Sequence, residues 1–234
     1  TSDLTPGDHR RSITFSVGDS SFVYEIKLTA HPNQVVRMKP GITDNTVLAL
    51  TSQTPSQGPS FLIEINASTG DITKFFDAGF SPLDFDFATG SSIVHLLSPD
   101  SEPSLVVDLE NNSYLPSRTY SPVASSIQVM PDGRTIIGQA ERSRNIDLYE
   151  PGSTTPAFSQ SFYTFVGEIN RPMTLSADGS ILYTLSDFGN ATSYSIGANE
   201  FVQLESLNSM RYDTRLPSDI LVPETSREIF FRNT

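Results

Sequence analysis

The sequence predicts an all-β fold, a five-bladed β-propeller with four antiparallel strands in each blade. Short β-rich runs alternate with turn signals along the chain, and the spacing of apolar residues that marks an amphipathic helix is absent. Turn signals that follow the first strand of each unit recur every 43 to 49 residues. Four short strands in a repeat of about 40 to 50 residues is typical of a propeller blade.

The repeat is easiest to see in the turns between the first and second strands. Pro131-Asp132-Gly133 and Ala177-Asp178-Gly179 each stand between two β-rich runs. Asp-Gly turns in this setting are a strong local signal for a β-hairpin. The corresponding turns of the other units are Pro40-Gly41, Ala88-Thr89-Gly90 and the stretch from Pro223 to Ser226.

These turns divide the chain into blades within one expected domain, residues 1–234. Residues 1–10 are expected to form a tail, and the complete blades to span residues 34–76, 82–115, 126–163 and 172–204. The closing blade would combine inner strands from residues 218–234 with outer strands from residues 11–29, which leaves no open sheet edge. The alternative is two tandem β-sandwiches, whose turn pattern would repeat at about 100 residues.

Composition limits the classes of partner. The net charge of −12 argues against nucleic acid or an anionic membrane surface. No apolar run approaches the roughly 18 residues of a membrane span, so we expect no transmembrane segment. There is no cysteine, which excludes disulfides and thiol chemistry.

The expected setting is secreted, cell-surface or periplasmic, with the chain acting as a monomeric domain. Within this sequence, no stretch is expected to act as a signal peptide. Asn66, Asn111 and Asn190 each begin a match to the glycosylation sequon, although such matches also arise by chance in a chain rich in Ser and Thr.

Two blade segments carry a family resemblance. The runs from Val129 to Ile136 and from Thr174 to Tyr183 resemble the blades of bacterial YVTN/lactonase-type and WD40-like propellers. Those families include enzymes, receptors and scaffolds, so the resemblance implies the fold alone. The Trp-Asp ending of WD40 blades is missing, since the chain has no tryptophan.

The loops from second to third strands and from blade to blade share one side of a propeller, here called the long-loop face, and such loops commonly carry ligands. The candidate ligand-binding residues on it are Arg118, Tyr120, Arg142, Arg144, Arg171, Phe188, Arg211, Tyr212 and Arg215. Guanidinium groups bind anions through paired hydrogen bonds, and aromatic rings stack on apolar ligand faces. The same residue types are frequent in protein interfaces, and the alternative is that these arginines are simply solvated.

A second candidate site lies on a first strand, which should line the central channel. Asp84 and Asp86 alternate with phenylalanines, so both carboxylates are expected on one side of that strand. The pair could bind Ca²⁺ or act as acid and base. The alternatives are wet or backbone-bonded aspartates, or an Arg37–Asp86 ion pair. No other cofactor is expected.

Together these observations favour a non-catalytic recognition module whose ligand is a glycan, an anionic small molecule or a partner protein. The competing class is a lactonase-like or glycosidase-like hydrolase that uses channel carboxylates. A third class is a structural scaffold within a larger surface assembly. No Gly-x-Ser-x-Gly, Walker-type or dinucleotide-binding motif is present.

Overall fold

The described residues of the computed structural model contain strands and turns but no helix, and therefore no helix that could cross a membrane. The structure describes residues 7–17, 20–30, 33–53, 60–99, 102–121, 123–139, 145–161, 173–185, 191–207, 219–221 and 230–232.

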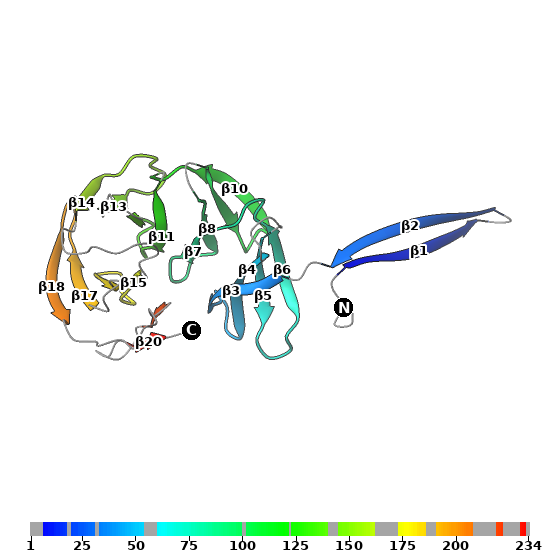
Figure 1. Ribbon diagram of the computed structural model, residues 1–234, viewed down its shortest axis with the longest axis horizontal. Coiled ribbons are helices and arrows are strands. Elements are labelled where there is room, and N and C mark those ends of the chain that lie inside the picture. The colour runs from blue at the N-terminus through cyan, green and yellow to red at the C-terminus, as the bar shows by residue number, and fades with distance from the viewer. Residues whose placement is uncertain are drawn as a thin grey trace.

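Four antiparallel four-stranded sheets are arranged around a common centre as the blades of a propeller (Figure 1). The first blade contains β3 (Asn33–Pro40), β4 (Thr46–Gln53), β5 (Phe61–Asn66) and β6 (Ile72–Asp77). The second contains β7 (Asp84–Phe87), β8 (Ile93–Leu97), β9 (Ser104–Asp108) and β10 (Ser113–Arg118). The third contains β11 (Ala124–Val129), β12 (Thr135–Gln139), β13 (Asn145–Tyr149) and β14 (Phe158–Ser161). The fourth contains β15 (Met173–Leu175), β16 (Ile181–Leu185), β17 (Ala191–Ile196) and β18 (Phe201–Leu207).

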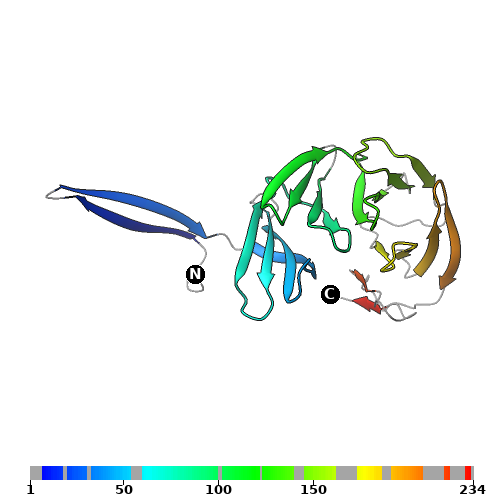
Figure 2. The same cartoon turned by 180° about the vertical axis from the view of Figure 1, so that it is seen from behind.

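The predicted propeller of four-stranded antiparallel blades is confirmed, but the count of five is not. β19 (Asp219–Leu221) and β20 (Phe230–Arg232) form a two-stranded sheet on the ring between the fourth blade and the first (Figure 2). β1 (Gly7–Val17) and β2 (Ser20–Ala30) form a separate two-stranded hairpin. The expected fusion of the two terminal pairs into one closing sheet is therefore not found among the described residues. Only residues 31–32 separate β2 from β3, which restricts where the hairpin can reach.

The Asp-Gly turns form as the sequence predicts. Gly133 and Gly179 adopt positive φ angles of 85° and 70°, where a side chain would be strained. In the second of these turns, the Gly179 N–H donates to the Ser176 carbonyl at 2.8 Å, and the Asp178 carboxylate accepts from the Ser180 N–H at 3.0 Å. Hydrogen bonds from Ser176 and Ser180 hold the pKa of Asp178 at about 2.

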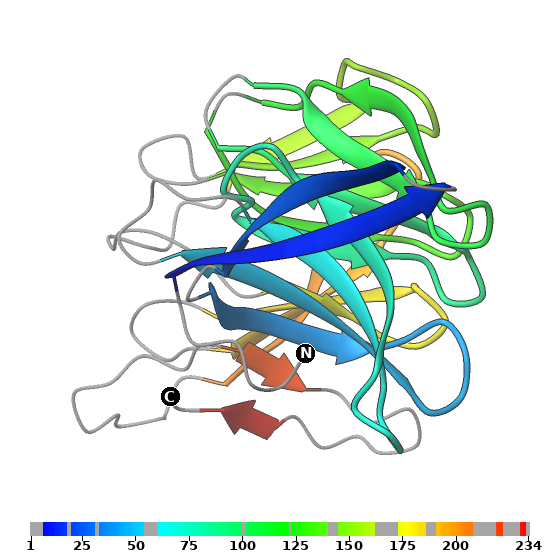
Figure 3. The same cartoon turned by 90° about the vertical axis from the view of Figure 1, so that its right-hand side faces the viewer.

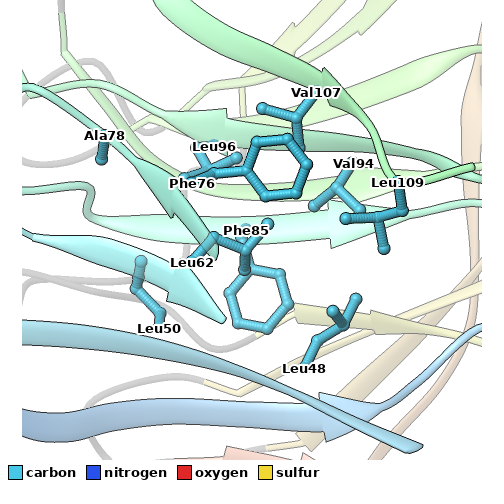
Figure 4. Close-up of a cluster of buried hydrophobic side chains, with 10 residues drawn as sticks. All are labelled: Leu48, Leu50, Leu62, Phe76, Ala78, Phe85, Val94, Leu96, Val107 and Leu109. Carbon is cyan, nitrogen blue, oxygen red and sulfur yellow. The ribbon is translucent and has the colours of Figure 1, made fainter. Parts of the chain in front are cut away.

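Apolar side chains join each complete blade to the next. The core between the first and second blades contains Leu48, Leu50, Leu62, Phe76, Ala78, Phe85, Val94, Leu96, Val107 and Leu109 (Figure 4). A second apolar core, which includes Ile136, Leu148 and Leu182, joins the third and fourth blades. The ring is therefore held by packing of sheet on sheet.

Candidate functional site

The interface between the second and third blades holds the buried ionisable groups of both blades. Its apolar part includes Leu97, Ile127, Ile137 and Tyr149. The polar residues buried around it are Asp84, Asp86, His95, Ser104, Gln139 and Asp147. Clusters of buried ionisable groups mark candidate functional sites, although structural networks produce them as well.

Asp84 and Asp86 lie on one side of β7, as their alternation with phenylalanine predicts, and that side faces the third blade. Their residues are 2% and 7% exposed, so both carboxylates need partners. Two cations of β3 supply them: Arg37 Nη1 lies 3.0 Å from Asp84 Oδ1, and Lys39 Nζ lies 2.5 Å from Asp86 Oδ1. The ion pairs link the inner strands of the first and second blades.

The inner strand of the third blade supplies the remaining partners. The Ile127 N–H donates to Asp84 Oδ2 at 3.1 Å, and the Val129 N–H donates to Asp86 Oδ2 at 2.6 Å. These residues are two apart on β11, so their N–H groups point the same way, toward β7. The carboxylates thus accept hydrogen bonds from N–H groups of β11 that point away from β12 and have no partner within their own sheet.

The two aspartates form a ladder from β3 through β7 to β11, here called the inner-strand ladder. Burial raises the pKa of Asp86, against the opposing effect of Lys39. Burial opposes the charge on Lys39, but the Asp86 and Asp84 carboxylates outweigh it and raise the pKa of Lys39. Lys39 therefore stays cationic at neutral pH, and the ladder is built for holding strands together.

A second group, here called the His95 cluster, lies nearer the long-loop face and consists of His95, Tyr120 and Arg118. His95 Nδ1 and Tyr120 OH are 3.1 Å apart and share a hydrogen bond. Burial, and then the positive charge of Arg118, lower the pKa of His95 to about 4. Burial also raises the pKa of Tyr120, while the Arg118 charge opposes this rise. At neutral pH both rings are therefore uncharged beside a cation.

The third blade contributes its own polar groups to the interface. The rings of Tyr120 and Tyr149 meet edge to face, with centroids 5.2 Å apart. Burial, and then the Asp147 charge, raise the pKa of Tyr149 to about 12. Asp147 accepts a hydrogen bond from Gln139 Nε2. The interface is thus packed and hydrogen-bonded around two neutral tyrosines.

The structure brings together two of the predicted ligand-binding residues, Arg118 and Tyr120. Arg118 ends β10 and is half-buried, whereas Tyr120 is 7% exposed and packs in the interface. The remaining predicted ligand-binding residues lie outside the described residues: Arg142, Arg144, Arg171, Phe188, Arg211, Tyr212 and Arg215.

The Ca²⁺ site expected at Asp84 and Asp86 stays a prediction. In the part of the chain that the structure describes, no group of three or more His, Asp or Glu side chains could hold a metal ion. Each of the two carboxylates already binds a cation and a backbone N–H group. A calcium ion there would have to displace Arg37 and Lys39.

Sequence reasoning missed His95 and Lys39 as members of these groups. A signal was present, because His95 interrupts the apolar run Ile93-Val94-His95-Leu96-Leu97. A polar residue buried in such a run needs a hydrogen-bond partner.

Comparison with known proteins supports the fold. No family model and no curated protein sequence matches the chain. Among solved structures, the chain is similar to hydrazine synthase from Kuenenia stuttgartiensis, with 14% identity and a TM-score of 0.52. The match covers 72% of this chain and 47% of that one, so this chain spans about half the length of that structure. In all, 843 solved chains match, and a fold shared so widely does not define an activity.

Proposed function

We propose that this chain is an extracellular or periplasmic recognition module that binds an anionic ligand on the long-loop face, at Arg118. The observation that carries the proposal is the position of Arg118. It ends β10 beside the buried pair of His95 and Tyr120, and it is half-buried. Among the described residues, ion pairs join carboxylates to Arg37, Lys39, Lys74 and Arg134, but none joins Arg118.

This arrangement suits recognition of a carboxylate or sulfate. The guanidinium presents a rigid fork of donors that pairs with two oxygens of one anion. Partial burial strengthens such a contact, because water screens the charge less. The ligand classes that fit are an acidic glycan, an anionic small molecule, or an acidic side chain of a partner protein.

The inner-strand ladder disfavours the hydrolase alternative. A glycosidase-like mechanism requires one carboxylate that protonates the leaving group and a second that acts as nucleophile or base. Asp84 and Asp86 are each committed to a cation and to a backbone donor. Using them in catalysis would first require breaking contacts that hold three blades together.

The extracellular or periplasmic location is part of the same proposal and has its own support. Asn111, which begins one of the sequons, is exposed in the turn between β9 and β10. Its side-chain amide donates to Asp108 Oδ2 at 2.6 Å. Expression through a eukaryotic secretory pathway should add a glycan there, seen as a mass shift that Asn111→Gln removes. A secreted chain that stays unmodified would contradict this support for an extracellular location.

The ligand-binding part is tested by screening the purified chain on glycan and small-anion arrays, with EDTA and Ca²⁺ arms. We expect saturable binding of at least one acidic ligand in both arms, weakened roughly tenfold or more in Arg118→Ala. Arg134→Ala is the matched control, because Arg134 lies in a turn of the opposite face and pairs with Asp132 at 2.7 Å. Binding unchanged in Arg118→Ala, or silence on every array, would contradict the proposal.

A further inference from the structure

The first blade has an apolar face that no four-stranded blade covers among the described residues. Cross-strand pairing places Met38, Ala49, Ile63 and Phe75 in one row on the side opposite Leu48 and Leu50. On this open face of the first blade, Val35, Met38, Ile72 and Phe75 of the two flanking strands are 49%, 54%, 58% and 53% exposed, while Ala49 and Ile63 between them are buried. Exposed apolar side chains gathered on one face of a sheet are typical of an interaction surface.

In a ring, the element next to this face should be the last blade. The sheet in that position, β19–β20, has two strands where every other blade has four (Figure 1). β19 lies against β15 of the fourth blade. Two further strands beside β20 would complete the sheet and extend it over the open face of the first blade.

The hairpin β1–β2 has the form of those two missing strands. By register, Ile13 pairs with Tyr24 and Phe15 with Phe22, and alternate positions lie on the same side. The positions of that side are occupied by Ile13, Phe15, Val17, Phe22, Tyr24, Ile26 and Leu28, with Gly7, His9, Arg11, Ser20 and Ala30 at the remaining positions. A two-stranded hairpin with one apolar side is marginally stable alone and needs a surface to cover.

The link to β3 keeps this hairpin away from its own ring. If the hairpin formed the two outer strands of the last blade in its own ring, β2 would be the outermost strand of that blade. The chain would then have to cross from β2 to β3, which is the innermost strand of the first blade. That crossing spans about 14 Å, three strand spacings, whereas two residues reach at most about 11 Å. The other connections between blades use five, six or eleven residues. Accordingly, the hairpin projects outward beyond the first blade (Figures 1 and 3).

We propose that the hairpin of one copy completes the last blade of a second copy. Its apolar side covers the open face of the first blade there, and β1 pairs with β20. The second copy returns its own hairpin, which gives a strand-exchanged dimer with two-fold symmetry. A link too short for closure within one chain favours this exchange. This proposed dimer differs from the monomeric domain that the sequence suggested.

The first test is the mass of the full chain in solution over a concentration series. We expect twice the mass of one chain. Insertion of about eight Gly/Ser residues between His31 and Pro32 lets the hairpin reach its own ring, and should shift the mass to one chain without loss of folding. A monomeric wild-type chain, or a dimer that the insertion leaves unchanged, would overturn the proposal.

Complementation gives the second test. Phe15→Glu/Phe22→Glu disables the hairpin, and Met38→Glu/Phe75→Glu disables the open face. Each variant alone should be monomeric. An equimolar mixture should form a heterodimer, because the intact hairpin of the second variant can bind the intact open face of the first. Thr14→Glu/Ser21→Glu, on the other side of the hairpin, is the matched control and should remain dimeric. A mixture that stays monomeric would mean that the hairpin binds its own chain or a different protein, and the exchange would be disproved.

Discussion

The two faces of the second blade differ in chemistry, although one short strand contributes to both. β7 reads Asp84-Phe85-Asp86-Phe87, and its phenylalanines face the first blade while its aspartates face the third. The interface with the first blade is mainly an apolar core, crossed at its inner edge by the ion pairs from β3 to the two aspartates. The interface with the third blade combines apolar packing with the His95 cluster, hydrogen-bonded tyrosines and the hydrogen bonds from the aspartates to β11. An apolar interface thus needs only complementary shapes, whereas a polar one also fixes which groups must meet.

The largest loss of stability is expected from disrupting the apolar core between the first and second blades. Phe85 is fully buried in that core. Phe85→Ala should lower the free energy of unfolding by about 3–5 kcal/mol, through lost burial and the cavity left behind. Urea denaturation measures the change, with Ile93→Ala as a control that should cost about 1 kcal/mol or less because Ile93 is exposed. Equal losses in the two variants would contradict the packing described.

Removing the partner of a buried ion pair should lower the free energy of unfolding somewhat less. Asp86→Ala leaves the Lys39 ammonium and the Val129 N–H without their acceptor. The expected loss is about 2–4 kcal/mol, at the low end for a buried pair because a quarter of the Lys39 side chain is exposed.

A replacement of both charges distinguishes pairing from simple burial. Lys39→Leu/Asp86→Leu removes both charged groups together, so it should recover part of the stability that Asp86→Ala loses. The same urea series measures it, with Asp71→Ala, at an exposed carboxylate, as the reference. A double variant less stable than Asp86→Ala would argue against the ion pair as the source of the loss.

The His95 cluster makes the polar interface sensitive to acid. As pH falls below 6.5, the unfolded chain protonates His95, while the folded chain resists until about pH 4. The unfolded state therefore gains stability across that window, and folding stability should fall by roughly 2 kcal/mol between pH 7 and pH 5. His95→Gln should lack this component when both proteins are unfolded with urea at each pH. Parallel curves for the two proteins would contradict the burial of a neutral imidazole.

The smallest effect is expected at the edge of the same cluster. Arg118 is half-buried and lowers the pKa of His95, so Arg118→Ala should move that pKa upward from about 4 toward its ordinary value. Stability at pH 7 should change by about 1 kcal/mol or less. NMR titration of the His95 ring measures the shift, and Arg134→Ala should leave it unchanged. A His95 pKa that does not respond to Arg118 would place the two groups farther apart than described.

The sequence predicted the elements that depend on local signals. The Asp-Gly turns, the four-stranded blades and the common side of Asp84 and Asp86 all follow from residue types and alternation. The one ion pair raised from the sequence, as an alternative, has the wrong partner. Sequence suggested Arg37 with Asp86, whereas Arg37 meets Asp84 and Lys39 meets Asp86. The register between strands of different blades is set by packing, which neither strand encodes alone.

Tyr120 shows a second limit of sequence reasoning. It was expected in a long loop over the ligand-binding face, but β10 continues to Arg118 and only residues 119–123 connect it to β11. So short a connection crosses close to the interface, and Tyr120 packs there against Tyr149. Loop length depends on where strands end, which is the least certain part of a sequence-based assignment.

The inner-strand ladder has a consequence for blade identity. In a repeat protein whose blades are alike, any blade could take the place of another, and misassembly would be common. Here the first inner strand carries cations, the second carries carboxylates, and the third presents backbone donors. A blade in the wrong position would bury a charge without its partner. The ladder therefore selects the native order of the first three blades, because every buried charge is paired only in that order.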